Sequence, residues 1–198
     1  MMRRFRYGSS LVLVPILLAG LQACALVPRP VVSHDPLTAD EHVLLGQSYE
    51  AQGLRERATY EYEAALRQDN SSIAALIARG NVSFESSKLQ EAEEYFSQAL
   101  ALAPQHAGAK NNLAMVYLSR GERLDDAERL ARQALDRGGT LRPYVLDTLA
   151  TLYVRQGRYE EAQAALAEAE AAASSDQILN ERLSQLRREL PPASSPTP

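Results

Sequence analysis

Few side chains in this sequence could support chemistry, and they are scattered. Three histidines occur, and they share neither a predicted helix face nor a metal-ligand spacing: His34, His42 and His106. Neighbouring carboxylates also occur, and three such pairs each lie on a predicted second helix or at its start: Glu93-Glu94, Asp125-Asp126 and Glu160-Glu161. Such pairs are typical of a solvated helix face rather than of acid and base groups that converge on a substrate. The sequence therefore predicts no metal site and no catalytic carboxylates.

The sequence also lacks the motifs that position a nucleophile, a zinc-bound water or a phosphate. It contains no G-x-S-x-G turn, no H-E-x-x-H helix and no G-x-x-x-x-G-K-[ST] loop. Its single cysteine, Cys24, has no second thiol with which to bind a metal or form a disulfide. We therefore expect a protein that is not an enzyme and that uses no cofactor.

Cys24 ends a segment with the features of a secretory signal. Three arginines within the first six residues precede an apolar stretch from Leu11 to Leu21. The residues Leu21-Gln22-Ala23-Cys24 resemble the bacterial lipobox, in which the cysteine receives a diacylglycerol and becomes the first residue of the mature protein. Gln22 departs from that motif, where a small residue is more usual. The resemblance implies lipidation at Cys24, with acyl chains such as palmitate as the only non-protein group.

Two other interpretations of the leader remain open. Ala23-Cys24-Ala25 also fits the A-x-A site of ordinary signal peptidase, and an uncleaved leader could act as a membrane anchor. Lipidation is favoured because an exported lone thiol is otherwise a liability in an oxidising compartment. A spanning helix needs about 20 apolar residues, and the uncharged stretch reaches that length only by including Gly8, Ser9, Ser10 and Gln22.

The leader also implies where the protein lies. Ala25, rather than Asp, follows the cysteine, which in the Gram-negative lipoproteins that this leader resembles implies an outer-membrane lipid anchor facing the periplasm. Residues 25–37 contain three prolines and no helical pattern, so we expect a tether that reaches up to roughly 40 Å. Without the leader arginines, 18 basic and 25 acidic residues remain, which disfavours a nucleic-acid partner.

The main part of the sequence repeats about every 34 residues. Small and aromatic residues recur in four copies: Gly46, Tyr49, Ala58, Tyr62 and Ala65; then Gly80, Phe84, Ala92, Phe96, Ala99 and Pro104; then Ala114, Tyr117, Ala127 and Ala134; then Ala150, Tyr153, Ala162 and Ala169. Phe84 stands one place later than the period predicts. The pattern resembles the tetratricopeptide repeat, a helix-turn-helix unit of 34 residues. It implies an all-α fold, a right-handed α-solenoid of about four repeats.

Each repeat predicts two helices. The first helices are expected at residues 39–52, 72–85, 107–119 and 143–156, and the second at 54–68, 88–103, 125–137 and 158–173. Thr38 and Glu41 form a T-x-x-E capping box at the first start. Gly53, Gly121 and Gly157 follow three helix ends, where a left-handed residue closes a helix most easily.

The last predicted helix, residues 176–190, carries leucines on one stripe: Leu179, Leu183, Leu186 and Leu190. We expect this helix to cap the apolar end of the last repeat, because terminal repeats of solenoids need a polar outer face. The alternative is a short coiled coil with a second copy, which would make the protein a dimeric spacer. The predicted organisation is a signal peptide (1–23), a lipidated tether (24–37), four repeats (38–71, 72–106, 107–140 and 141–175), a capping helix (176–190) and a disordered tail (191–198).

The tetratricopeptide resemblance also implies a binding surface. Ligand segments of that family usually lie along a groove lined by the first helix of each repeat. Carried onto this sequence, the groove residues are Gln47, Asn81, Glu85, Asn111, Asn112, Met115, Tyr144, Asp147, Thr151 and Arg155. Asn81 and Asn112 are the strongest candidates, because a primary amide offers a donor and an acceptor to a peptide backbone. The family's clamp for a terminal carboxylate uses several Lys or Arg residues, and here only Lys110 and Arg155 are available, with Arg79 at a position that can turn away.

Taken together, these patterns predict a monomeric lipoprotein scaffold that binds a protein or peptide segment in its groove. Its layout is similar to that of small bacterial lipoproteins that help assemble pili or secretion pores. Two other functions stay open: an adaptor for an envelope enzyme that acts on peptidoglycan or a surface protein, and the dimeric spacer.

Overall fold

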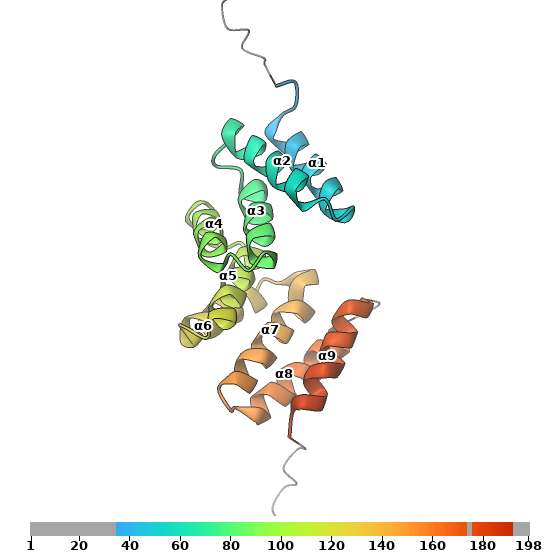
Figure 1. Cartoon of the computed structure of the whole chain (residues 1–198). Coiled ribbons are helices and arrows are strands. Elements are labelled where there is room, and N and C mark those ends of the chain that lie inside the picture. The colour runs from blue at the N-terminus through green and yellow to red at the C-terminus, as the bar shows by residue number, and fades with distance from the viewer. Residues whose placement is uncertain (1–34, 174–175, 192–198) are drawn as a thin grey trace, which may run out of the picture. The chain divides into compact units, whose positions relative to one another are not determined.

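The computed structural model describes residues 35–173 and 176–191, and this part of the chain is all-α (Figure 1). The helices are α1 (Ala39–Ala51), α2 (Arg55–Gln68), α3 (Ile73–Glu85), α4 (Leu89–Leu102), α5 (Ala107–Arg120), α6 (Leu124–Leu135), the 3-10 turn η1 (Gly139–Leu141), α7 (Arg142–Arg155), α8 (Tyr159–Ala172) and α9 (Gln177–Glu189). Each predicted helix is present, and its ends lie within two residues of the prediction. The predicted signal peptide, Cys24, almost all of the predicted tether and nearly all of the predicted tail lie outside the described residues.

Local sequence signals set the helix ends. The capping box of α1 is confirmed: Glu41 N–H contacts Thr38 Oγ1, and Thr38 N–H donates to Glu41 Oε2 at 2.7 Å. Gly53, Gly121 and Gly157 all have positive φ. The turn after α3 has no glycine, and Ser87 takes the left-handed conformation there with φ 60°. The turn between α3 and α4 therefore uses a residue with a Cβ, which disfavours the left-handed conformation.

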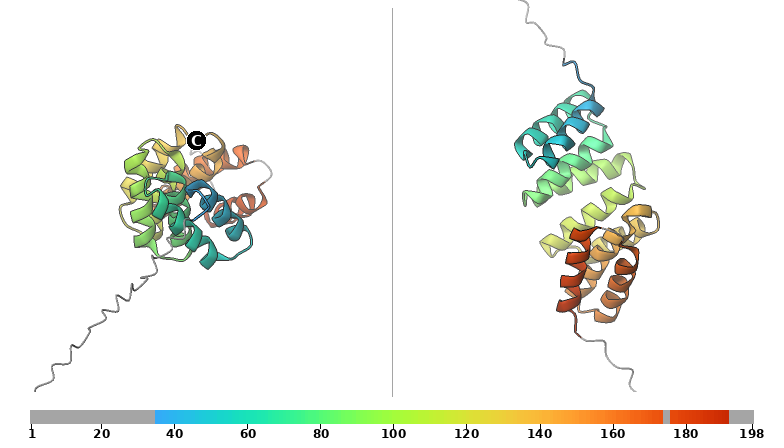
Figure 2. Two further views of the ribbon diagram at one scale, coloured as in Figure 1. Left: turned by 90° about the horizontal axis from the view of Figure 1, so that it is seen from above. Right: turned by 90° about the vertical axis from the view of Figure 1, so that its right-hand side faces the viewer.

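Helices pack in consecutive pairs, α1 with α2 through α7 with α8, and the pairs follow one another in chain order (Figure 2). The four repeat alanines of the second helices are fully buried: Ala58, Ala92, Ala127 and Ala162. A Cβ on Gly46 would lie 2.3 Å from the Tyr62 ring, and one on Gly80 would lie 2.5 Å from the Phe96 ring. Small residues therefore recur because the two helices of a pair approach each other closely there.

The first helices of repeats 2, 3 and 4 (α3, α5 and α7) also pack on the preceding repeat, and α1 differs accordingly. Ala75, Ala78 and Val82 of α3 are buried against repeat 1. The positions one period earlier, on α1, are Glu41, Leu44 and Ser48, and all three are exposed. The outer face of α1 is thus mostly polar, as the first unit of a stack requires.

The helix α9 caps the other end of the stack (Figure 1). Leu179, Leu183 and Leu186 are buried in the same apolar cluster as α7 and α8. Arg187 donates to Glu170 of α8 at 2.8 Å. The capping prediction is confirmed, and a coiled coil through these leucines would first require α9 to leave the domain. Among the described helices, none combines the length and the apolar character needed to cross a bilayer.

Candidate functional site: a cleft between the first helices of repeats 2 and 3

A cleft of about 230 Å³ opens between α3 and α5. It is lined by Asn81, Phe84, Glu85, Phe96, Asn112 and Met115. Four of these six residues belong to the predicted groove set. The repeat spacing therefore identified residues on α3 and α5 that lie together in this cleft.

An amide pair lies in the lining of this cleft. Asn112 donates from Nδ2 to Asn81 Oδ1 at 2.8 Å, which links repeat 3 to repeat 2. The Asn81 NH₂ group and the Asn112 Oδ1 have no hydrogen-bond partner in the described part of the chain. Neither group is fully buried. The pair therefore presents one donor group and one acceptor.

The sequence placed Met115 in the groove, but it missed the two aromatic walls of the cleft, Phe84 and Phe96. Phe96 is 1% exposed, while Phe84 and Met115 are partly exposed. The sequence did contain one sign that Phe84 differs, because Phe84 stands one place later than the aromatic residue of the other repeats. Tyr117 and Tyr153, at the regular position, are buried in the core. The ring of Phe84, one place later, lines the cleft.

The remaining predicted groove residues do not join this cleft. Gln47 and Arg155 are exposed. Asn111 is only 6% exposed, with its Nδ2 3.6 Å from Met115 Sδ and its Oδ1 buried without a hydrogen-bond partner among the described residues. Tyr144 donates its hydroxyl to Asp176, the N-cap of α9. These residues are thus divided between exposed positions and positions committed to internal contacts.

A second hollow, of about 300 Å³, lies between α7 and α9 and includes Asp147 and Thr151. Asp147 is 3% exposed, and its Oδ2 lies 2.8 Å from Arg182 Nε on α9. Burial raises the pKa of Asp147, and the charge of Arg182 opposes that shift. Thr151 donates to the Asp147 carbonyl at 2.9 Å. The capping helix therefore uses groove residues of repeat 4 for its own attachment.

The cations needed for a carboxylate clamp do not converge. Arg79 is 6% exposed and donates to Ser83 at 2.8 Å and to Glu91 at 2.7 Å, so it is turned away from the groove. Lys110 is equally buried, with its nearest described partner Gln105 at 3.4 Å. Of the three cations considered from the sequence, Arg155 alone is exposed. This arrangement does not match a cluster that grips one terminal carboxylate.

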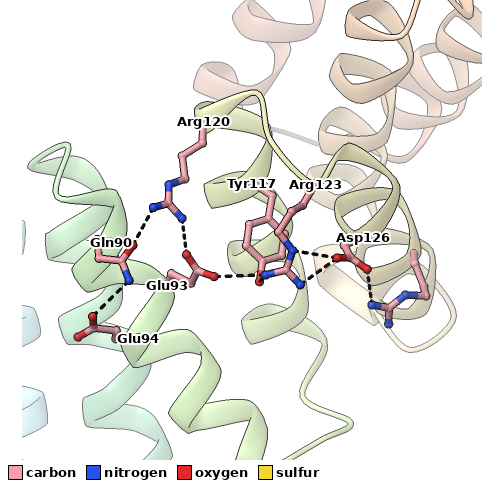
Figure 3. A network of polar contacts seen from close by, with 8 residues as sticks. Gln90, Glu93, Glu94, Tyr117, Arg120, Arg123 and Asp126 are labelled. Atoms are coloured by element: carbon pink, nitrogen blue, oxygen red, sulfur yellow. Dashed lines mark hydrogen bonds and ion pairs between the residues drawn. The ribbon is translucent and has the colours of Figure 1, made fainter.

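One carboxylate of each neighbouring pair forms an ion pair, and Figure 3 shows this for Glu93 and Asp126. The other member of each pair is exposed, as predicted, and makes no ion pair within the described residues: Glu94, Asp125 and Glu160. Glu93 of α4 lies 3.4 Å from Arg123, which also donates to Tyr117 Oη at 2.6 Å and stacks on its ring. Hydrogen bonds from Arg129 and Arg123 lower the pKa of Asp126. A carboxyl group with a lowered pKa holds no proton to donate near neutral pH and is a weak base. These contacts join consecutive repeats.

A similar set of contacts links repeats 3 and 4. Arg158 lies 2.6 Å from Glu128 of α6 and stacks 4.4 Å above the Tyr153 ring. A hydrogen bond from Arg158 lowers the pKa of Glu161. At the junction of repeats 2 and 3 and at that of repeats 3 and 4, an arginine in the turn of the later repeat therefore pairs with a glutamate of the repeat before it.

Two histidines have structural partners. His42 is 3% exposed, and its Nδ1 lies 2.7 Å from Glu61 Oε2. Its Nε2 is 3.3 Å from Asp35 Oδ2 but out of line for a hydrogen bond. The Nδ1 of His106 accepts from Ala109 N–H at 3.1 Å and caps α5. Within residues 35–173 and 176–191, no three His, Cys, Asp or Glu side chains gather in a way that could hold a metal ion.

Comparisons with known proteins agree with this architecture. The family described as "Tetratricopeptide repeat" matches residues 77–141 and 148–190, which is more than half of the chain. A curated relative, "Tetratricopeptide repeat protein 14" of Mus musculus, is 33% identical over 87 residues, which are 44% of this chain. The chain spans 11% of the length of that relative.

Solved structures show the same fold at low sequence identity. The pilF protein of Pseudomonas aeruginosa is 21% identical, with a TM-score of 0.66 over 76% of this chain and 68% of its own. MamA is 23% identical, with a TM-score of 0.59 over 68% of this chain and 77% of its own. The repeat spacing, the paired helices and the family match lead to one conclusion: this chain belongs to the tetratricopeptide repeat family.

Proposed function

We propose that this protein is a non-catalytic scaffold that binds a segment of a partner protein at the cleft between α3 and α5. The tetratricopeptide fold supports protein–protein interaction, and its members are generally non-catalytic. The observation that carries the proposal is the lining of the cleft, in which apolar walls adjoin an amide pair. Protein-binding sites combine these features, since apolar contacts supply affinity and a few placed polar groups fix orientation.

The proposal extends to a lipid anchor at Cys24 in the outer membrane, facing the periplasm. Its support is the lipobox-like sequence that ends at the only cysteine. Several acyl chains would hold the protein stably, because each buried CH₂ contributes about 0.8 kcal/mol. The tether would then present the repeats near the membrane surface.

Within that envelope location, we propose a role in assembling or localising a pilus or secretion complex. The support is the layout of a lipoprotein leader followed by repeats, together with the pilF fold likeness. Because the same layout serves many adaptors, the complex itself has to be identified by its bound partner.

The scaffold function can be tested by affinity purification of the full chain from its own membranes. Wild type is compared with Met115→Trp, which fills the cleft, and with Glu94→Arg, which changes an exposed side chain of α4. We expect one protein to co-purify with wild type and Glu94→Arg but not with Met115→Trp. Equal recovery of that protein with all three forms would reject the cleft as the binding site.

The anchor is tested separately by labelling cells with palmitate. Incorporation into wild type and its loss in Cys24→Ala are expected, together with release of the variant from the membrane fraction. If both forms remain unlabelled, the lipoprotein assignment fails, while the scaffold function stands.

A further inference from the structure

We infer that the partner segment carries an apolar side chain followed closely by an acidic residue. The apolar side chain fills the cleft between α3 and α5, and the acidic residue pairs with Arg155 on α7. This inference rests on the proposed function and specifies the ligand of the same site.

The cleft has the size and lining to receive one apolar side chain. Its volume of about 230 Å³ is several times the roughly 30 Å³ share of one water molecule. Phe84, Phe96 and Met115 supply its carbon surface. Phe96 is held at the base by the packing of α3 on α4, since a Cβ on Gly80 would lie 2.5 Å from its ring. A rigid aromatic base and a flexible methionine suit side chains such as Leu, Met or Phe.

The amide pair then fixes the backbone of the bound segment. The Asn81 NH₂ group can donate to a backbone carbonyl, and the Asn112 Oδ1 can accept from a backbone N–H. Both groups belong to the lining of the cleft that takes the side chain. One residue of an extended segment offers a carbonyl, an N–H and a side chain together.

The charges along the groove specify the neighbouring residue. Glu85, Ser119 and Arg155 occupy equivalent positions at the ends of α3, α5 and α7. Glu85 is neutralised by Arg55, whose Nη2 lies 2.9 Å from Glu85 Oε2. Arg155 is exposed and makes no ion pair in the described part of the chain. The uncompensated charge of this row is therefore positive, and it complements a carboxylate.

The Arg155 side chain also extends toward the end of α5, one of the helices that line the cleft. Its Nη1 lies 3.9 Å from the position that a Cβ would occupy on Gly121, the residue that ends α5. A segment that leaves the cleft past Ser119 toward α7 would meet this guanidinium. A carboxylate at that point gains a charge-assisted hydrogen bond, whereas a lysine or arginine would be repelled.

The test selects a random peptide display library on the full-length chain in detergent micelles. We expect enriched peptides to share Leu, Met or Phe, followed within a few residues by Asp or Glu. Met115→Trp should weaken their binding about tenfold or more, and Arg155→Glu should weaken it about threefold. Arg137→Glu is the matched control, because Arg137 is also exposed and makes no ion pair with any described residue but does not line the cleft. Circular dichroism confirms that each variant is folded.

The outcomes separate this inference from the proposed function. Peptides that Met115→Trp displaces, but that lack an acidic residue or ignore Arg155→Glu, would overturn the inference and leave the scaffold function intact. A selection without any peptide that Met115→Trp displaces would reject both. A synthetic peptide of residues 25–34 of this chain is added as a competitor. If this peptide binds in the cleft and no selected peptide does, the ligand is the predicted tether of this chain, and the inferred partner segment is rejected.

Discussion

The Asn112 side chain on α5 donates a hydrogen bond to the Asn81 side chain on α3 at 2.8 Å. Both residues were selected from the sequence as groove contacts for a peptide, and the fold uses one polar group of each side chain to join repeats 2 and 3. The remaining donor and acceptor can serve a ligand. One pair of side chains can therefore contribute both to stability and to binding.

The stability contribution of this pair can be measured by a double-mutant cycle. Asn81→Ala and Asn112→Ala should each lower the free energy of unfolding by about 1 kcal/mol, because each leaves a partly buried amide with fewer partners. The double variant should lose less than the sum, with a coupling energy of about 0.5–1.5 kcal/mol. Urea unfolding followed by circular dichroism gives the four values. A coupling of zero would show that the two amides do not interact in solution.

The contact between Gly80 and Phe96 leads to a second prediction. Gly80→Ala places a methyl group 2.5 Å from a fully buried ring, so it should destabilise the domain by about 1–3 kcal/mol. Phe96→Leu should partly rescue it, because the smaller side chain vacates the contact. The equivalent positions in repeat 4 are Ala150 and Leu166, both buried, so the sequence already contains the rescued combination.

Thermal unfolding of wild type, the two single variants and the double variant provides the measurement. The rescue requires the double variant to be more stable than Gly80→Ala. If Phe96→Leu simply adds its own loss to that of Gly80→Ala, close packing at Gly80 is not the reason for the glycine.

Ser87 should be improved by glycine. Its φ of 60° is costly for a residue with a Cβ, so Ser87→Gly should raise the free energy of unfolding by about 0.5–1 kcal/mol. The neighbouring Ser86→Gly is the control, because Ser86 has φ −84° and gains nothing from glycine. Urea midpoints that rise for Ser86→Gly as much as for Ser87→Gly would contradict this account of the turn.

Asp147 should give the domain a measurable pH dependence. Burial raises its pKa above the ordinary value of 3.8, so the folded state holds this proton more tightly than the unfolded state does. The stability associated with the proton is fully present below about pH 4 and is lost as pH rises through the folded-state pKa. Asp147→Asn removes the charge, so its stability relative to wild type should increase from pH 4 to pH 7.

Urea unfolding of wild type and Asp147→Asn at several pH values between 4 and 7 tests this prediction. Asp136→Asn, at an exposed position after α6, controls for the loss of one carboxylate. A stability difference between Asp147→Asn and wild type that stays constant across this range would show that Asp147 does not titrate differently on folding.

Much of the fold could be predicted because the repeat constrains it locally. The buried alanines, the capping box at Thr38 and the glycines with positive φ are short-range signals, and each repeats or lies beside a helix end. The leucine stripe of α9 also indicated its capping role, because the last repeat of a solenoid leaves an apolar face that such a stripe can cover.

The candidate site was predicted only in part because its lining depends on three-dimensional neighbours. The period placed Asn81, Glu85 and Met115 on the groove, but it could not show that Phe84 and Phe96 form the cleft walls. Nor could it show that Arg182 of α9 pairs with Asp147. Both contacts depend on side-chain size and on the packing of one repeat against the next, which periodicity alone does not specify.

The most direct test of the central claim is photo-crosslinking of the full chain in living cells. A photoreactive residue replaces Glu85 or Met115 in the cleft, or Glu94 on the exposed side of α4 as the control. The account predicts that one and the same protein is trapped from both cleft positions and not from Glu94. Equal trapping from all three positions, or trapping from Glu94 alone, would contradict it.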